Sequence, residues 1–330
     1  MIRLFHDTHY DFIRWWKWAA GITVAFIVIG LASFAIKQPN LSIEFTGGTL
    51  MQLQFSKPVD VGQLRGYLDN AGINGAEIQQ FGNNREYTIR AQETHTTSTL
   101  AKGAETVAKQ VENLLVQRYG AANVRVIRTE AVGPKVGDEL KRDAIIAMLL
   151  SFLVTTIYLA IRFEWRFGIA ALIATGHDVF TTLAFLKLMH LEISLTVVAG
   201  LLTVLGYSLN DTIIIFDRVR ENLRRRQKIP LYDTLNRSVN ETLPRSVLTH
   251  ATVFATLLAL AILGGEVLRP FALVMLFGVL TGTFSSIYVA PPLLLWIEHR
   301  WPRTASDAGG ANRPRAAATR APAPRATMSR

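Results

Sequence analysis

The sequence predicts an α-helical multi-pass membrane protein with six transmembrane helices and an α+β ferredoxin-like extracytoplasmic domain between spans one and two. Of the 330 residues, 50% are hydrophobic and 18% charged, and the apolar residues form blocks instead of amphipathic stripes. A helix needs about 20 mostly apolar residues to cross the hydrocarbon core, and six blocks come close to that length or exceed it. These blocks are 18–36, 144–161, 168–186, 193–216, 246–263 and 271–297.

The distribution of basic residues predicts the orientation of the spans. Residues 1–17 are expected to be a cytoplasmic N-terminus, and 18–36 to be the first transmembrane helix, an uncleaved anchor. Short loops on the cytoplasmic side carry an excess of Lys and Arg. In this chain such residues lie at Arg3, Arg14, Lys17, Arg162, Arg166, 218–228, Arg300 and Arg303. With six spans, both termini are therefore predicted to be cytoplasmic, and the polar stretch 37–142 to lie outside.

The stretch 37–142 contains the pattern of a small α+β domain. Strands are predicted at 49–55, 75–81, 86–92 and 123–132, where β-branched or alternating residues occur. Helices are predicted at 59–72 and 99–120, each of which ends at a glycine. The resulting order, β-α-β-β-α-β, is typical of the ferredoxin-like fold.

The rest of the chain is predicted to be a five-helix transmembrane bundle, 143–300, with a cytoplasmic loop at 217–245, followed by a disordered basic cytoplasmic tail at 301–330. The net charge of +10 arises from 35 basic and 25 acidic side chains. Because the basic residues flank apolar blocks, they indicate contact with membrane lipids and no specific nucleic acid. The absence of cysteine excludes disulfides and thiolate metal sites, and no other metal site is predicted.

Two carboxylates lie inside apolar blocks. Asp211, next to Asn210, belongs to "GYSLNDTIIIFDR" (206–218), and Asp178 belongs to the third block. A carboxylate near the bilayer centre costs at least about 2.5–3.5 kcal/mol, so each is a candidate functional group. Helical spacing places polar and small residues on one stripe in each of three spans. The stripes are Ala171, Thr175, Asp178 and Thr182; Thr196, Gly200, Thr203, Tyr207 and Asn210; and Arg245, Thr249, Thr252 and Thr256.

These stripes are expected to pack on protein and to form a polar bundle axis, on which a carboxylate, an arginine and hydroxyls could carry a proton or cation. Asp211, Arg245, Asp178 and Asn210 are therefore predicted as ion-coupling residues, with His250, Thr249 and His177 as relay candidates. Structural alternatives stay open. Asp211 could be capped by hydroxyls, Asp178 and His177 could bind only backbone, Arg245 could extend to the headgroups, and each histidine could simply bond a neighbour.

Five segments together resemble the SecF members of the SecD/SecF family, in the resistance-nodulation-division superfamily of transporters. They are "FTGGT" (45–49), "VGPKVGDEL" (132–140), "HDV" (177–179), "GYSLNDTIIIFDRVRENL" (206–223) and "LPRSVLT" (243–249). The likeness covers roughly residues 5–300. Two positions depart from the family pattern: Glu44 stands where an Asp often precedes "FTGGT", and His250 stands where a small Ser is usual.

This resemblance implies a subunit of the Sec protein-export machinery in the bacterial cytoplasmic (inner) membrane. Its implied partners are SecD, the SecYEG channel, YajC and the translocating polypeptide. With SecD it would use the proton-motive force, or sodium, to assist late preprotein translocation and release at the outer face. It would need no cofactor beyond H⁺ or Na⁺ as coupling ion, and the family's coupling aspartate and arginine carry over onto Asp211 and Arg245.

Two other classes remain as alternatives. A stand-alone ion-driven exporter of lipids or small molecules would usually have two repeats in one chain, whereas this chain has one. An intramembrane aspartyl protease would use Asp178 and Asp211 as a dyad, but the expected Gly-x-Gly-Asp context is missing before Asp211. No catalytic residue is predicted, and the chain is not expected to be an enzyme.

Overall fold

The computed structural model describes residues 8–73, 76–80, 84–91, 102–225 and 229–302. Within them, six helical segments are long and apolar enough to span a membrane, and a small antiparallel sheet lies between the first two. The fold class predicted from the sequence is thereby confirmed. The segments are η1 (Ile13–Trp15) with α1 (Trp16–Ile36), α5 (Pro134–Arg162), α6 (Trp165–Leu188), α7 (Leu195–Arg224), α8 (Leu231–Leu263), and α9 (Gly265–Tyr288) with α10 (Ala290–Arg300). Most of the predicted tail, from residue 303, lies outside the described residues.

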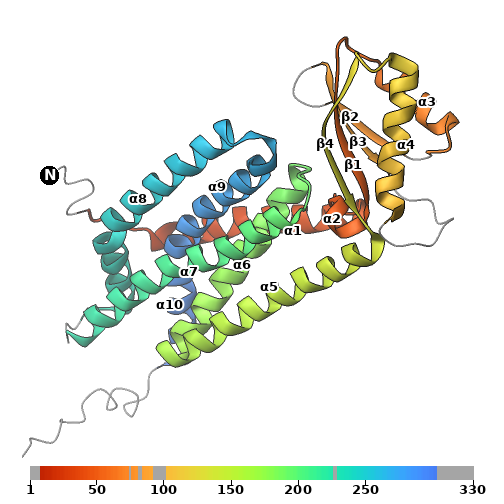
Figure 1. The fold of residues 1–330 in the computed structure, drawn as a ribbon. Helices are drawn as coiled ribbons and strands as arrows, with labels where there is room; N and C mark the ends of the chain where they lie inside the picture. Colours follow the sequence, from red (N-terminus) through yellow and green to blue (C-terminus); the bar gives the residue numbers. More distant parts are fainter. Residues whose placement is uncertain (1–7, 74–75, 81–83, 92–101, 226–228, 303–330) are drawn as a thin grey trace, which may run out of the picture.

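The sheet domain sits at one end of the helical bundle, beyond α2 (Ile43–Thr46) and the start of α5 (Figure 1). Its strands are β1 (Gly48–Phe55), β2 (Glu77–Gln80), β3 (Glu86–Ala91) and β4 (Val124–Val132), in the spatial order β2-β3-β1-β4. Helices α3 (Val61–Asn70) and α4 (Lys102–Tyr119) follow β1 and β3 and cover one face of the sheet. Apolar side chains from both layers, such as Leu53, Leu64 and Leu115, form its core. This is the ferredoxin-like arrangement.

Three helices differ in extent from the predicted spans. Helix α5 begins at Pro134, so the last part of the predicted domain 37–142 is helical and continuous with the second span. Helices α7 and α8 extend through most of the predicted loop 217–245. Ion pairs hold these extensions together: Arg218 lies 2.5 Å from both Glu221 and Glu241. Charged residues of this kind end an apolar block but do not end a helix. Hydropathy alone therefore makes these three helices too short.

The last span is divided into two helices. Helix α9 ends at Tyr288, and α10 starts at Ala290. The break precedes Pro291 and Pro292, which have no amide hydrogen and therefore cannot donate helical hydrogen bonds to the preceding turn. The apolar block 271–297 predicts a single helix, and the structure has two.

The two glycines of "FTGGT" allow the domain to pack closely on α5. Gly47 and Gly48 have φ values of 71° and 118°, which disfavour side chains. A Cβ atom on Gly47 would also lie 2.8 Å from the Cα of Pro134, and one on Gly137 would lie 3.0 Å from the Gly47 nitrogen. These positions require glycine because the backbones of α2 and α5 touch there.

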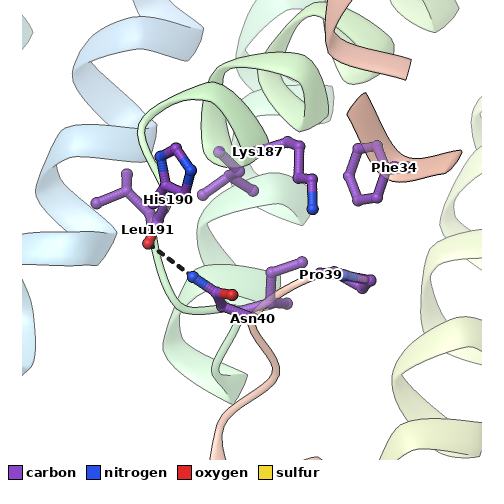
Figure 2. Close-up of a pocket in the computed structure, with 8 residues that line it drawn as sticks. Phe34, Pro39, Asn40, Lys187, His190 and Leu191 are labelled. Atoms are coloured by element: carbon purple, nitrogen blue, oxygen red, sulfur yellow. Dashed lines mark hydrogen bonds between the residues drawn. The ribbon is translucent and has the colours of Figure 1, made fainter. Parts of the chain in front are cut away.

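The connection between α1 and α2 is fastened to the connection between α6 and α7. The Asn40 side chain donates a 3.1 Å hydrogen bond to the His190 carbonyl (Figure 2), and the Ile193 amide donates to the Asn40 carbonyl at 2.7 Å. The Glu44 carboxylate accepts a 2.6 Å bond from the amide of Leu195, in the first turn of α7. A carboxylate is favourable at a helix N-terminus, which gives a structural reason for the acidic residue before "FTGGT".

A partly buried ion pair joins the sheet to the connection between α6 and α7. Arg90 on β3 contacts Glu192, which lies between α6 and α7, and its guanidinium also donates to the Leu41 carbonyl at 3.3 Å. Burial raises the pKa of the Glu192 carboxyl above its usual range, although Arg90 acts in the opposite direction. The two residues border a cavity of about 220 Å³ between the open sheet face and the bundle.

Helices α7 and α9 cross with almost no space between their backbones. A Cβ atom on Gly278 would lie 2.1 Å from a methyl carbon of Val204, and one on Gly282 would lie 3.0 Å from the Cβ of Ser208. Small residues at membrane helix interfaces permit this approach. The crossing places Ser208 of α7 directly against α9.

Gly278→Ala is expected to destabilise the protein by about 1–3 kcal/mol, because the added methyl group forces α7 and α9 apart. The measurement is thermal unfolding of the purified protein in detergent. Gly206→Ala is the matched control, since a Cβ there meets nothing within 4 Å. Equal melting temperatures for the two variants would contradict the close crossing.

Candidate functional site

The first buried carboxylate binds three helices together. Asp178 of α6 has 0% exposure. Its Oδ2 accepts a 2.6 Å hydrogen bond from the Ser285 hydroxyl of α9 and another from the Ser208 hydroxyl of α7. Its Oδ1 lies 2.9 Å from Nδ1 of the neighbouring His177. Helix α6 is continuous through His177 and Asp178.

The polar stripe of α6 faces the interior, as the spacing predicted. Ala171, Thr175, Asp178 and Thr182 are all buried. The Thr175 and Thr182 hydroxyls donate to carbonyls four residues earlier, at 2.9 and 2.7 Å. The two threonines are therefore satisfied within their own helix, and of this stripe Asp178 is the residue that hydrogen-bonds to α7 and α9.

The second buried carboxylate pairs with a histidine. Asp211 of α7 has 3% exposure, and its Oδ2 lies 3.1 Å from Nε2 of His250 on α8. On the other side of the ring, His250 Nδ1 lies 2.9 Å from the Thr283 hydroxyl of α9. The Tyr207 ring packs at 5.4 Å between ring centroids. Asp211 Oδ2 is buried and accepts no hydrogen bond from any described residue.

The two carboxylate sites are adjacent. Ser208, which donates to Asp178, lies three residues before Asp211 on the same helix, and α9 contributes Ser285 to one site and Thr283 to the other. Residues three apart share a helix face. Ser208 and Thr283 were not identified from the sequence. The spacing from Asp211 could have indicated Ser208, whereas Thr283 had no local signal.

Three of the predicted residues lie elsewhere. Arg245 and Thr249 of α8 and Asn210 of α7 are exposed, and Arg245 makes no ion pair with any residue that the structure describes. Within this chain the structure therefore groups Asp211 with His250, and Asp178 with His177, but it does not bring Arg245 to Asp211.

The expectation that the stripes of α7 and α8 pack inside the bundle is corrected for most of their members. The inward face of α7 carries Val197, Leu201, Val204, Ser208 and Asp211, and that of α8 carries Ser246, His250, Leu257 and Ala261. Each inward face is displaced by one residue, about 100° of rotation, from the predicted stripe. Polar residues are thus left on the outside of two apolar helices: Thr203, Asn210, Arg245, Thr249, Thr252 and Thr256. We call this set the outward polar residues.

Comparisons with known proteins agree on one family. A model described as "Protein export membrane protein SecD/SecF, C-terminal" matches residues 110–300, and a "SecD/SecF GG Motif" model matches residues 32–59, which include Gly47 and Gly48. The protein translocase subunit SecF of Gemmatimonas aurantiaca is 60% identical over 92% of this chain and 91% of its own length. SecF of Escherichia coli O157:H7 is 37% identical over 87% of both chains.

Solved structures give the same result for the fold. A crystal structure of SecDF from Thermus thermophilus, a translocon-associated membrane protein, has a TM-score of 0.80 at 34% identity over 91% of this chain. A structure of SecDF in its super-membrane-facing form has a TM-score of 0.65 at 33% identity. This chain spans 40% and 41% of those two longer chains.

Proposed function

This chain belongs to the SecD/SecF family of protein-export membrane proteins, and we propose that together with SecD it uses an ion gradient to drive a late stage of preprotein translocation. In this proposal the coupling ion is H⁺ or Na⁺. The translocating polypeptide is released at the outer face of the bacterial inner membrane.

The observation that supports this role most directly is the buried Asp211. An ionisable side chain inside a membrane helix bundle is expensive and marks an ion pathway by default. Asp211 is nearly inaccessible and has a carboxylate oxygen without a hydrogen-bond donor. The charged form of a buried carboxylate is stabilised only by the neighbouring charges and hydrogen-bond donors. When the helices that carry those neighbours move, the carboxylate binds or releases its proton. Movement and ion transfer are thereby coupled.

The outward polar residues support a partner that covers α7 and α8. The Thr203, Thr252 and Thr256 hydroxyls donate to carbonyls of their own helices. The Asn210 amide and the Arg245 guanidinium would face hydrocarbon unless another protein packed there. We propose that SecD provides that surface. Arg245 would then lie at the boundary between the two subunits, where it can approach Asp211 when the helices shift.

The topology in this proposal follows the basic residues. Both termini and the ends of α7 and α8 near Arg218 would be cytoplasmic, and the ferredoxin-like domain periplasmic. The domain would meet SecD or the emerging polypeptide, and the bundle would act beside SecYEG, with YajC as a further partner. Membrane lipids would surround α5, whose apolar residues are largely exposed.

The experiment uses the natural absence of cysteine in this chain. Asn210→Cys and Thr252→Cys, each carrying a photoactivatable cross-linker, are expected to form adducts with co-expressed SecD in membranes. Leu149→Cys on α5, which is 66% exposed, is the matched lipid-facing control and should give none. Adducts from Leu149 alone, or from none of the three positions, would contradict a SecD surface on α7 and α8.

The alternative function is a stand-alone exporter of lipids or small molecules. Ion-driven transport by this chain in vesicles without SecD and SecYEG would favour it. Under the proposed function, proton-driven translocation in inverted vesicles requires SecD.

A further inference from the structure

His250 is the histidine that faces the buried Asp211, with its Nε2 3.1 Å from the carboxylate oxygen Oδ2. The hydrogens of this contact can be assigned from the network. The Thr283 hydroxyl has a single hydrogen, and it donates that hydrogen to the Val279 carbonyl at 2.8 Å. When the hydroxyl donates to Val279, its oxygen accepts from Nδ1 of His250, 2.9 Å away, in the tautomer that carries the ring hydrogen on Nδ1.

The position of the hydrogen on Nδ1 determines whether Nε2 is a hydrogen-bond donor or an acceptor. In a neutral imidazole with its hydrogen on Nδ1, Nε2 has a lone pair. A lone pair 3.1 Å from a buried carboxylate oxygen is repelled by it, and the low dielectric of the interior strengthens that repulsion. The contact becomes attractive when one proton is bound to either partner. In the tautomer with its hydrogen on Nδ1, the contact is therefore favourable only when the pair holds one proton.

We propose that His250 is the proton-holding partner of Asp211: the two side chains bind one proton between them, Thr283 orients the imidazole, and the site selects H⁺ over Na⁺. This inference rests on the proposed function and names its coupling ion. Release of the proton restores the repulsion, separates α7 from α8 at this level, and leaves the Asp211 carboxylate free for Arg245.

The donor set does not suit sodium. A hard cation is held by several oxygen ligands, whereas the Asp211 carboxylate is faced by the His250 imidazole nitrogen and by the Ser246 hydroxyl. A nitrogen base beside one carboxylate binds a proton well and a metal cation of this kind poorly.

The other ionisable groups around the pair are few. Helix α7 contributes Tyr207, whose ring packs against His250. Helix α6 contributes Asp178, which pairs with His177 and accepts a hydrogen bond from Ser208, three residues before Asp211. Helix α9 presents Thr283 at this level, and Arg245 of α8 is directed outward. The pH response of the site should therefore be dominated by Asp211 and His250.

The test is the pH profile of gradient-driven translocation in inverted vesicles containing the full chain, SecD and the SecYEG channel. His250→Gln keeps an uncharged hydrogen-bonding group of similar size but cannot titrate, and it should displace the pH step of the profile by at least about one unit. Thr283→Val should displace the step toward lower pH, because Nδ1–H loses its acceptor, and Thr283→Ser should restore it. His299→Gln, on the exposed part of α10, is the control and should leave the profile unchanged.

Each outcome has a defined meaning. An unchanged profile for His250→Gln, or translocation by the unmodified protein that needs Na⁺ and fails in K⁺, would overturn the role of His250. If Asp211→Asn also translocates normally, the proposed function itself fails. If Asp211→Asn is inactive while His250→Gln has the unmodified profile, only the present inference fails.

Discussion

Asp211→Asn is expected to remove nearly all of the increment in translocation that an ion gradient provides, while the protein still folds and inserts. Asparagine has almost the same shape as aspartate but cannot bind and release a proton. The position is nearly inaccessible, so the substitution exposes no new surface. Because the asparagine NH2 group can donate a hydrogen bond to Nε2 of His250, the helices should remain packed. The measurement is the rate of late preprotein translocation in inverted vesicles, with and without a gradient.

Asp217→Asn is the matched control for this prediction. Asp217 lies on the same helix, two turns further on, and forms a half-exposed ion pair with Arg162 at 2.7 Å. Removing such a pair costs only about 0–1 kcal/mol and should leave gradient-driven translocation intact. If the two variants behaved alike, in either direction, the particular role of the buried carboxylate would be excluded.

Asp178→Ala is expected to cause the largest loss of stability, about 2–4 kcal/mol. The substitution removes the acceptor for Ser208 and Ser285 and leaves two buried hydroxyls, together with the His177 ring, without their partner. It also opens a void where α6, α7 and α9 meet. Thermal or denaturant unfolding in detergent would measure the effect. Asp178→Asn, which retains an acceptor oxygen, should lose less.

Asp143→Ala provides the comparison for an exposed carboxylate. Asp143 pairs with Arg142 at 3.3 Å, and both side chains are largely exposed. The free energy of unfolding should change by no more than about 0.5 kcal/mol. A loss at Asp178 as small as that at Asp143 would mean that the three-helix junction does not depend on the carboxylate.

The roles of the two aspartates therefore separate. Asp178 has hydrogen-bonding partners on both oxygens and connects three helices, which is the arrangement of a structural junction. Asp211 has an oxygen, Oδ2, that accepts no hydrogen bond from a described residue, and this oxygen lies 3.1 Å from the titratable His250. The sequence had assigned both residues to ion coupling. Their different environments make Asp211 the better candidate, and they explain why its conservative variant should lose activity without losing the fold.

The sequence by itself determined the features that depend on local composition. Blocks of apolar residues predicted six spans, alternation and helical spacing predicted the order of the ferredoxin-like domain, and the cost of a buried charge identified Asp178 and Asp211. The glycines of "FTGGT" were noticed as a motif. The structure explains why glycine is needed there: the backbone contacts Pro134 and Gly137, which lie about ninety positions further along the chain.

Only the tertiary structure decided which face of each helix is turned inward. The polar stripes of α7 and α8 are one residue away from the buried faces, so Asn210 and Arg245 point out while Asp211 and His250 point in. Periodicity gives the spacing of a stripe, but the rotation of a helix about its axis depends on what packs against it. The pairing of Asp211 with His250 and Thr283 joins three helices, and no local pattern in the chain encodes such a contact. For that reason, the candidate coupling residues could be found in the sequence, but their partners could be found only in the fold.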